Sequence, residues 1–125
     1  MGKVIEMEKL ARQALLFDFY GELLTKHQRS IYEEVVLDDY SLSEVAENHG
    51  ISRQGVHDLV KRSSKILEDY EQKLHLVDKF VAIREKIHEI HGLTQNYAGQ
   101  DLDDQDLNHL LKEIGSLTNS ILEEL

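Results

Sequence analysis

The stretch Ser41–Lys65, SLSEVAENHGISRQGVHDLVKRSSK, has the pattern of two helices joined by a tight turn. Ser41 stands where it can cap the first helix, and Glu44 three residues later predicts a capping box. Gly50 can end that helix in the left-handed conformation, and Ser52 can cap the next one. A pair of helices joined by a short turn that contains glycine is the helix-turn-helix arrangement. The alternative is an ordinary helical hairpin.

The second helix of this stretch is predicted to have an apolar face and a basic face. Val56, Leu59, Val60, Ile66 and Leu67 recur at helical spacing on the apolar face. From Ser52 to Lys65, four basic side chains and one carboxylate give a net charge of +3, whereas the whole chain carries −10. A positive face on an acidic protein indicates a polyanionic partner for that face.

If this helix enters the major groove of DNA, its outward side chains divide into two groups. Those predicted to read bases are Arg53 on guanine, Gln54 on adenine, Asp58 on a cytosine amino group, and His57 and Lys61 beside them. Those predicted to contact phosphates, without reading sequence, are Ser52, Arg62 and Lys65. His57 is also within reach of a phosphate in this placement.

Composition indicates an all-α protein of one domain, or of a small domain with an appendage. The chain has 125 residues, no proline, no cysteine and few glycines. Without cysteine it can hold neither a disulfide nor a thiolate metal site, which fits a cytoplasmic protein. No apolar run reaches the length of a membrane span, so we expect no membrane partner.

No residue pattern predicts an enzyme, and we expect no catalytic residue, no metal and no cofactor. There is no phosphate-binding glycine loop. Glu85 and His88 form a single pair with the spacing of a di-iron motif, whereas such sites need two pairs and two further glutamates. The run Asp101–Asp106 starts like a calcium loop but has Asp106 where glycine is required and Lys112 where the final glutamate belongs.

Upstream, the pattern predicts a helix from Ile5 to Leu24 and a second one capped by Thr25. This second helix would be the first of a three-helix DNA-binding unit, and Asp38-Asp39-Tyr40 would be a polar turn. Backbone N–H groups at a helix start suit a phosphate, so we expect phosphate contacts there. The side chains concerned are Lys26, Gln28 and Arg29; the alternative is that they are simply solvated.

After Lys65 the helical pattern continues to His91, either as one helix or as two with a bend near Tyr70. Gly92–Gln100 reads as a loop by composition, and Asp103 or Asp104 can cap a last helix. In that helix Leu107, Leu111, Ile114, Thr118, Ile121 and Leu125 form a heptad-like seam. The seam packs either on the preceding helix or on another subunit, and we favour a homo-oligomer, with a dimer first. We therefore divide the chain into a nucleic-acid-binding domain (1–70) and a hairpin or oligomerisation region (71–125).

The segments LTKHQRSIYEEVVL (24–37) and SLSEVAENHGISRQGVHDLVKR (41–62) resemble region four of sigma factors, which reads the −35 promoter element. More closely, LLFDFYGELLT (15–25), ISRQGV (51–56) and LEDYEQKL (67–74) look like the YlxM family of bacterial proteins. The resemblance is strong over about residues 15–76 and weak over the last helices. The chain is too short to carry the other regions of a complete sigma factor.

The resemblance implies a sigma-like helix-turn-helix protein that regulates, or takes part in, protein targeting by the signal recognition particle. One interpretation is a regulator that binds double-stranded DNA. The other is an accessory protein that contacts the RNA or the GTPase of that particle. A helix suited to a DNA major groove fits A-form RNA poorly, so RNA binding would depend on shape and charge. In a third interpretation the motif survives only as a packing scaffold.

Overall fold

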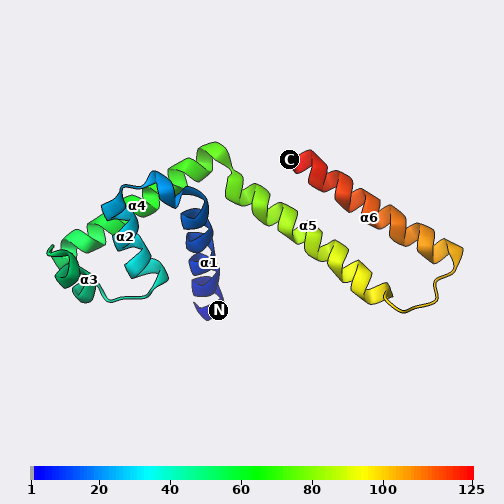
Figure 1. Ribbon diagram of the computed structural model, residues 1–125, viewed down its shortest axis with the longest axis horizontal. Coiled ribbons are helices and arrows are strands. Elements are labelled where there is room, and N and C mark those ends of the chain that lie inside the picture. The colour runs from blue at the N-terminus through cyan, green and yellow to red at the C-terminus, as the bar shows by residue number, and fades with distance from the viewer. Residues whose placement is uncertain (1) are drawn as a thin grey trace. The chain divides into compact units, whose positions relative to one another are not determined.

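The computed structural model describes the backbone of residues 2–125 and the side chains of residues 8–125, and this part of the chain is all helical (Figure 1). The predicted all-α class is confirmed. None of the described helices combines the length and the apolar character that a membrane crossing requires. The α-helices are α1 (Gly2–Tyr20), α2 (Lys26–Tyr32), α3 (Leu42–His49), α4 (Arg53–Leu74), α5 (Leu76–Tyr97) and α6 (Asp104–Glu124).

The chain forms two compact units, Met1–Val77 and Asp78–Leu125. The first holds α1 to α4, and the second holds most of α5 and all of α6. The proposed division into domains 1–70 and 71–125 concerns independent folding and stays a prediction.

The helix-turn-helix is built on a small apolar core. Ile31 of α2, Val45 and Ala46 of α3, and Val56 of α4 are buried against one another. Val35, Leu42, Ile51, Leu59 and Val60 are partly buried around them. One side chain from each of three helices thus fixes how α3 and α4 lie on α2, which is the arrangement that the apolar spacing predicts.

The helix starts are capped largely as the sequence predicts. Thr25 Oγ1 accepts from Gln28 N at 3.2 Å, and Gln28 Oε1 accepts from Thr25 N at 3.0 Å, which together make a capping box. Ser41 Oγ accepts from Glu44 N at 3.1 Å. The capping box predicted at Ser41 is wrong, because within the described side chains only this first bond forms there and the reciprocal pair lies at Thr25.

The helix that begins at Lys26 changes its winding before it ends. From Glu33 to Leu37 (η2) it is a π-helix, in which Asp38 N donates to Glu33 O at 2.9 Å. Asp39 then adopts a positive φ of 58° and Tyr40 N donates to Glu34 O at 2.9 Å. The turn predicted over Asp38-Asp39-Tyr40 is confirmed.

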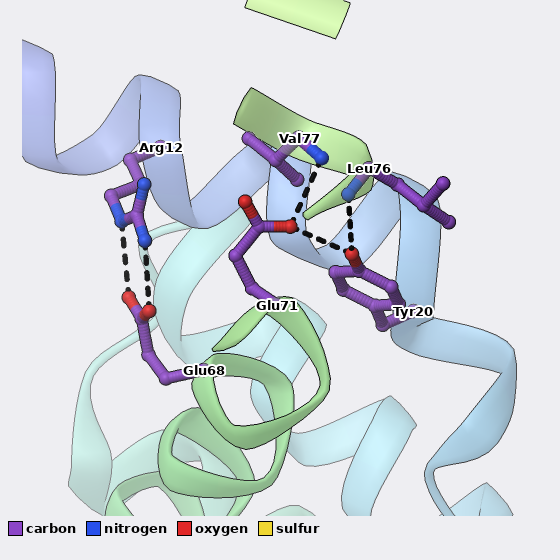
Figure 2. A network of polar contacts seen from close by, with 6 residues as sticks. All are labelled: Arg12, Tyr20, Glu68, Glu71, Leu76 and Val77. Atoms are coloured by element: carbon purple, nitrogen blue, oxygen red, sulfur yellow. Dashed lines mark hydrogen bonds and ion pairs between the residues drawn. The ribbon is translucent and has the colours of Figure 1, made fainter. Parts of the chain in front are cut away.

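A network of polar contacts joins α1 to the second half of α4 (Figure 2). Arg12 makes two hydrogen bonds to Glu68, at 2.8 and 3.1 Å. The Tyr20 hydroxyl donates to Glu71 Oε1 at 2.7 Å, and the Glu71 side chain is buried. This second contact is the stronger one, because a charged acceptor shielded from water binds its donor tightly.

The network continues across the break between α4 and α5. Leu76 N donates to the Tyr20 hydroxyl at 3.2 Å, and Val77 N donates to Glu71 Oε1 at 3.0 Å (Figure 2). His75 stands at the break with a φ of 56°. Of the two arrangements left open by the sequence, two helices are therefore observed. The bend expected near Tyr70 lies at His75 instead, where the Glu71 carboxylate and the Tyr20 hydroxyl accept from the first N–H groups of α5.

In the second unit, α5 and α6 lie antiparallel (Figure 1), with Lys86 Nζ 3.5 Å from Glu124 Oε1. Asp103 caps α6, since its Oδ1 accepts from Asp106 N at 2.7 Å. The loop predicted over Gly92–Gln100 is wrong, because α5 continues to Tyr97 and only the end of that segment turns. Leu93 faces Leu117 across a groove, so packing between helices outweighs a composition typical of loops.

Candidate nucleic-acid interface

The turn between α3 and α4 sets the start of the predicted reading helix. Gly50 has a φ of 66°, a left-handed conformation that other residues adopt only with strain. Ile51 N then donates to Ala46 O at 3.1 Å, and the Ile51 side chain packs on the core. Ser52 Oγ accepts from Gly55 N at 2.9 Å and caps α4. The four residues Gly50 to Arg53 thus reverse the chain without leaving the core.

The predicted contact residues of α4 lie on its exposed side. Val56 is fully buried, and the apolar stripe that it begins continues through Leu67. At 100° per residue, the predicted contacts cluster on the side of α4 opposite this stripe. All of them are exposed to solvent: Ser52, Arg53, Gln54, His57, Asp58, Lys61, Arg62 and Lys65.

Three of the predicted base-reading residues contact one another. Gln54 Nε2 donates to Asp58 Oδ1 at 3.0 Å, and His57 Nδ1 lies 3.6 Å from the same oxygen. The Asp58 carboxylate therefore has a donor in place, and its charge is offset where it would otherwise repel a phosphate. For Gln54 to pair with adenine, its amide must first leave Asp58. Asp58 thus competes with a base for this side chain.

The basic side chains of the same face have no acidic partner. Among the side chains described, from residue 8 onward, Arg53, Lys61, Arg62 and Lys65 make no ion pair. A phosphate that approaches this face therefore breaks no existing ion pair, and the positive charge is available to it.

The first turn of α2 is more occupied than the sequence suggests. Lys26 is exposed, but the Gln28 side-chain oxygen and backbone N–H are both used in the capping box with Thr25. The Arg29 guanidinium lies 5.8 Å from the centre of the Phe17 ring. Gln28 keeps only its amide N–H group for a phosphate, and Arg29 is partly held against α1.

A histidine contact that the sequence did not indicate lies beside this turn. The His27 ring packs edge-on against the His49 ring, with centroids 5.8 Å apart, and His49 Nε2 lies 2.7 Å from Glu34 Oε2. The start of α2 is thereby held beside the end of α3, three residues before the Ser52 cap. Glu34 and His49 are fifteen residues apart, so no local spacing predicts the pair.

Comparison with known proteins identifies the family. Residues 7–112 match the family model UPF0122, described as "Putative helix-turn-helix protein, YlxM / p13 like". A UPF0122 protein of Limosilactobacillus reuteri is 46% identical over 114 residues, which cover 90% of this chain and 97% of that protein. One from Streptococcus thermophilus is 42% identical over 115 residues (92% and 98%), and one from Anoxybacillus flavithermus is 44% identical over 111 residues (89% and 98%). The chain therefore belongs to the UPF0122 family of YlxM/p13-like helix-turn-helix proteins.

Proposed function

We propose that this protein is a regulator that binds double-stranded DNA through the exposed face of α4. The observation that carries the proposal is the set of unpaired basic side chains on that face, in a chain with a net charge of −10. Arg53 and Lys61 would read bases with Gln54 and His57, while Arg62 and Lys65 would hold the phosphates.

The distribution of charge supports one orientation on the nucleic acid. The unit Asp78–Leu125 carries four basic and ten acidic residues, a net charge of −6. A duplex is repelled by that unit and attracted by the start of α4. The acidic character of the whole protein therefore restricts which surface can approach DNA and leaves the basic face available.

The protein is further proposed to act as a homodimer, in which two reading helices meet two half-sites. Helix-turn-helix proteins bind half-sites about one helical turn apart in this manner, and their operators then have matching twofold symmetry. Operators of this kind would be pseudo-palindromic.

Fluorescence anisotropy tests the proposal. The protein is titrated onto labelled duplexes from its own operon, and onto signal recognition particle RNA, at several salt concentrations. Five phosphate contacts, from Lys26, Arg29, Lys61, Arg62 and Lys65, would give a slope of log K against log salt of about −4.5. Tight binding to one duplex with such a slope supports the DNA proposal.

The matched variants are Arg53→Ala and Lys73→Ala. Lys73 is an exposed lysine of the same helix, two turns beyond Lys65. Arg53→Ala should weaken binding to the preferred duplex by about 1–3 kcal/mol, with little change on other duplexes, whereas Lys73→Ala should leave both unchanged. A preference for the RNA would instead favour a role in the targeting particle. No binding to either at low salt would leave the GTPase as the partner to test, or the motif as a scaffold.

A further inference from the structure

The second unit, Asp78–Leu125, has almost no core of its own. Every side chain of this unit is described, and Leu110 is the only one that is buried. A groove of about 470 Å³ runs between α5 and α6, with Leu93 and Leu117 among the residues that line it. Helices derive most of their stability from packing, and a unit of about fifty residues with so little buried surface needs further cover.

The uncovered apolar surface forms one stripe, made of residues from both helices. On α6, Leu107, Leu111, Leu122 and Leu125 are 43%, 57%, 67% and 83% exposed, and at 100° per residue they fall within an arc of about 60°. On α5, Phe80 and Ile87 are 39% and 52% exposed and lie seven residues apart.

The two helices present these residues on the same side of the hairpin. Leu110 and Leu117 mark the side of α6 that is turned toward α5, and the exposed leucines lie about a quarter turn clockwise from it, viewed from the N-terminus. On α5, the half-buried Ile83 and Ile90 mark the inner side, and Phe80 and Ile87 again lie about a quarter turn clockwise. Because the helices are antiparallel (Figure 1), both rotations lead to one face.

We propose that a second copy of this chain covers the stripe, so that two hairpins form an antiparallel four-helix bundle. The proposal deepens the homodimer of the proposed function, on which it rests, by assigning its surface and orientation. A partner that binds only at times would leave the leucines in water for the rest, whereas a second copy is always at hand.

The charges at the two ends of the hairpin select the antiparallel orientation. Four aspartates, Asp101, Asp103, Asp104 and Asp106, gather where α5 turns into α6. At the other end, Arg84 borders the stripe with its guanidinium 5.4 Å from the centre of the Phe80 ring. An antiparallel pair keeps the two acidic ends apart and brings each toward the partner's arginine, while a parallel pair would place eight aspartates together.

Sedimentation equilibrium of the full chain measures the dimer dissociation constant. The variants are Leu111→Glu and Leu122→Glu, and the control is Asn119→Glu, which adds the same charge on the polar side of α6. Each leucine variant should raise the dissociation constant at least about 100-fold, because two carboxylates would enter the apolar interface, and the control should change it less than about threefold. A dimer that resists both leucine variants would overturn the assigned surface alone. A wild-type monomer at about 100 μM would overturn the dimer as well.

Disulfide cross-linking tests the orientation without relying on a destabilised variant. The chain has no cysteine, so each introduced cysteine is unique. A mixture of Arg84→Cys and Asp104→Cys proteins should form a disulfide-linked heterodimer on mild oxidation, and Asp104→Cys alone should not form a homodimer. The reverse pattern would overturn the antiparallel arrangement.

Discussion

Removing one hydroxyl, by Tyr20→Phe, should destabilise the first unit far more than such a small change normally does. The hydroxyl donates to the buried Glu71 carboxylate at 2.7 Å and accepts from Leu76 N at 3.2 Å. A hydrogen bond to a charged group contributes about 1.5–3 kcal/mol and a neutral one about 0.5–1.5 kcal/mol. The loss is therefore about 2–4 kcal/mol, a large part of the 5–15 kcal/mol that is usual for a domain. The aromatic ring and its packing remain.

Urea denaturation followed by circular dichroism measures this loss, and Tyr70→Phe is the matched control. The Tyr70 ring stacks on Tyr20 with centroids 6.0 Å apart, and its hydroxyl makes no hydrogen bond within the described part of the chain. We expect Tyr70→Phe to change the free energy of unfolding by less than about 0.5 kcal/mol. Equal midpoints for the two variants would refute the role assigned to the Tyr20–Glu71 contact.

Three further outcomes follow from the same structure. Burial, and the hydrogen bond to Glu71, raise the pKa of Tyr20 above 10.0, and burial also raises the pKa of Tyr32. Stability should then be fully present below pH 10 and fall as the pH rises further, with a shallower fall in Tyr20→Phe; pH-dependent urea midpoints measure it. Gly50→Ala meets no atom within 4 Å but places a side chain at a φ of +66°, so unfolding experiments should show a loss of about 1–2 kcal/mol with an unchanged fold. Lys65→Ala should weaken all duplexes alike and reduce the salt slope by about 1 in anisotropy titrations, unlike Arg53→Ala.

The helix-turn-helix was predictable because its signals are local. The capping residues Ser41 and Ser52, the left-handed Gly50 and the spacing of the apolar side chains all act within a few residues of one another. The capped start of α2 at Thr25 followed from the same reasoning. Such signals also place the exposed face of α4, since it is the side opposite the apolar stripe.

Contacts between distant residues decided the features that the sequence did not predict. The break at His75 depends on Glu71 and on Tyr20, which lies more than fifty residues earlier. The helical course of Gly92–Tyr97 depends on packing against α6, which outweighs its glycine and polar composition. Within the interface, the Gln54–Asp58 bond could have been inferred from the i, i+4 spacing, whereas the His49–Glu34 pair could not.

The link between Tyr20 and the start of α5 also imposes a delay during synthesis. The side chain of residue 20 cannot complete its contacts until residues 71, 76 and 77 have been made. At about 5–20 residues per second, the ribosome needs roughly 3–11 s to add the residues between Tyr20 and Val77. Throughout that interval the buried face of α1, with Leu16 and Tyr20, has no completed surface to dock on. The nascent chain must therefore be kept from aggregating for several seconds before its first helix finds its place.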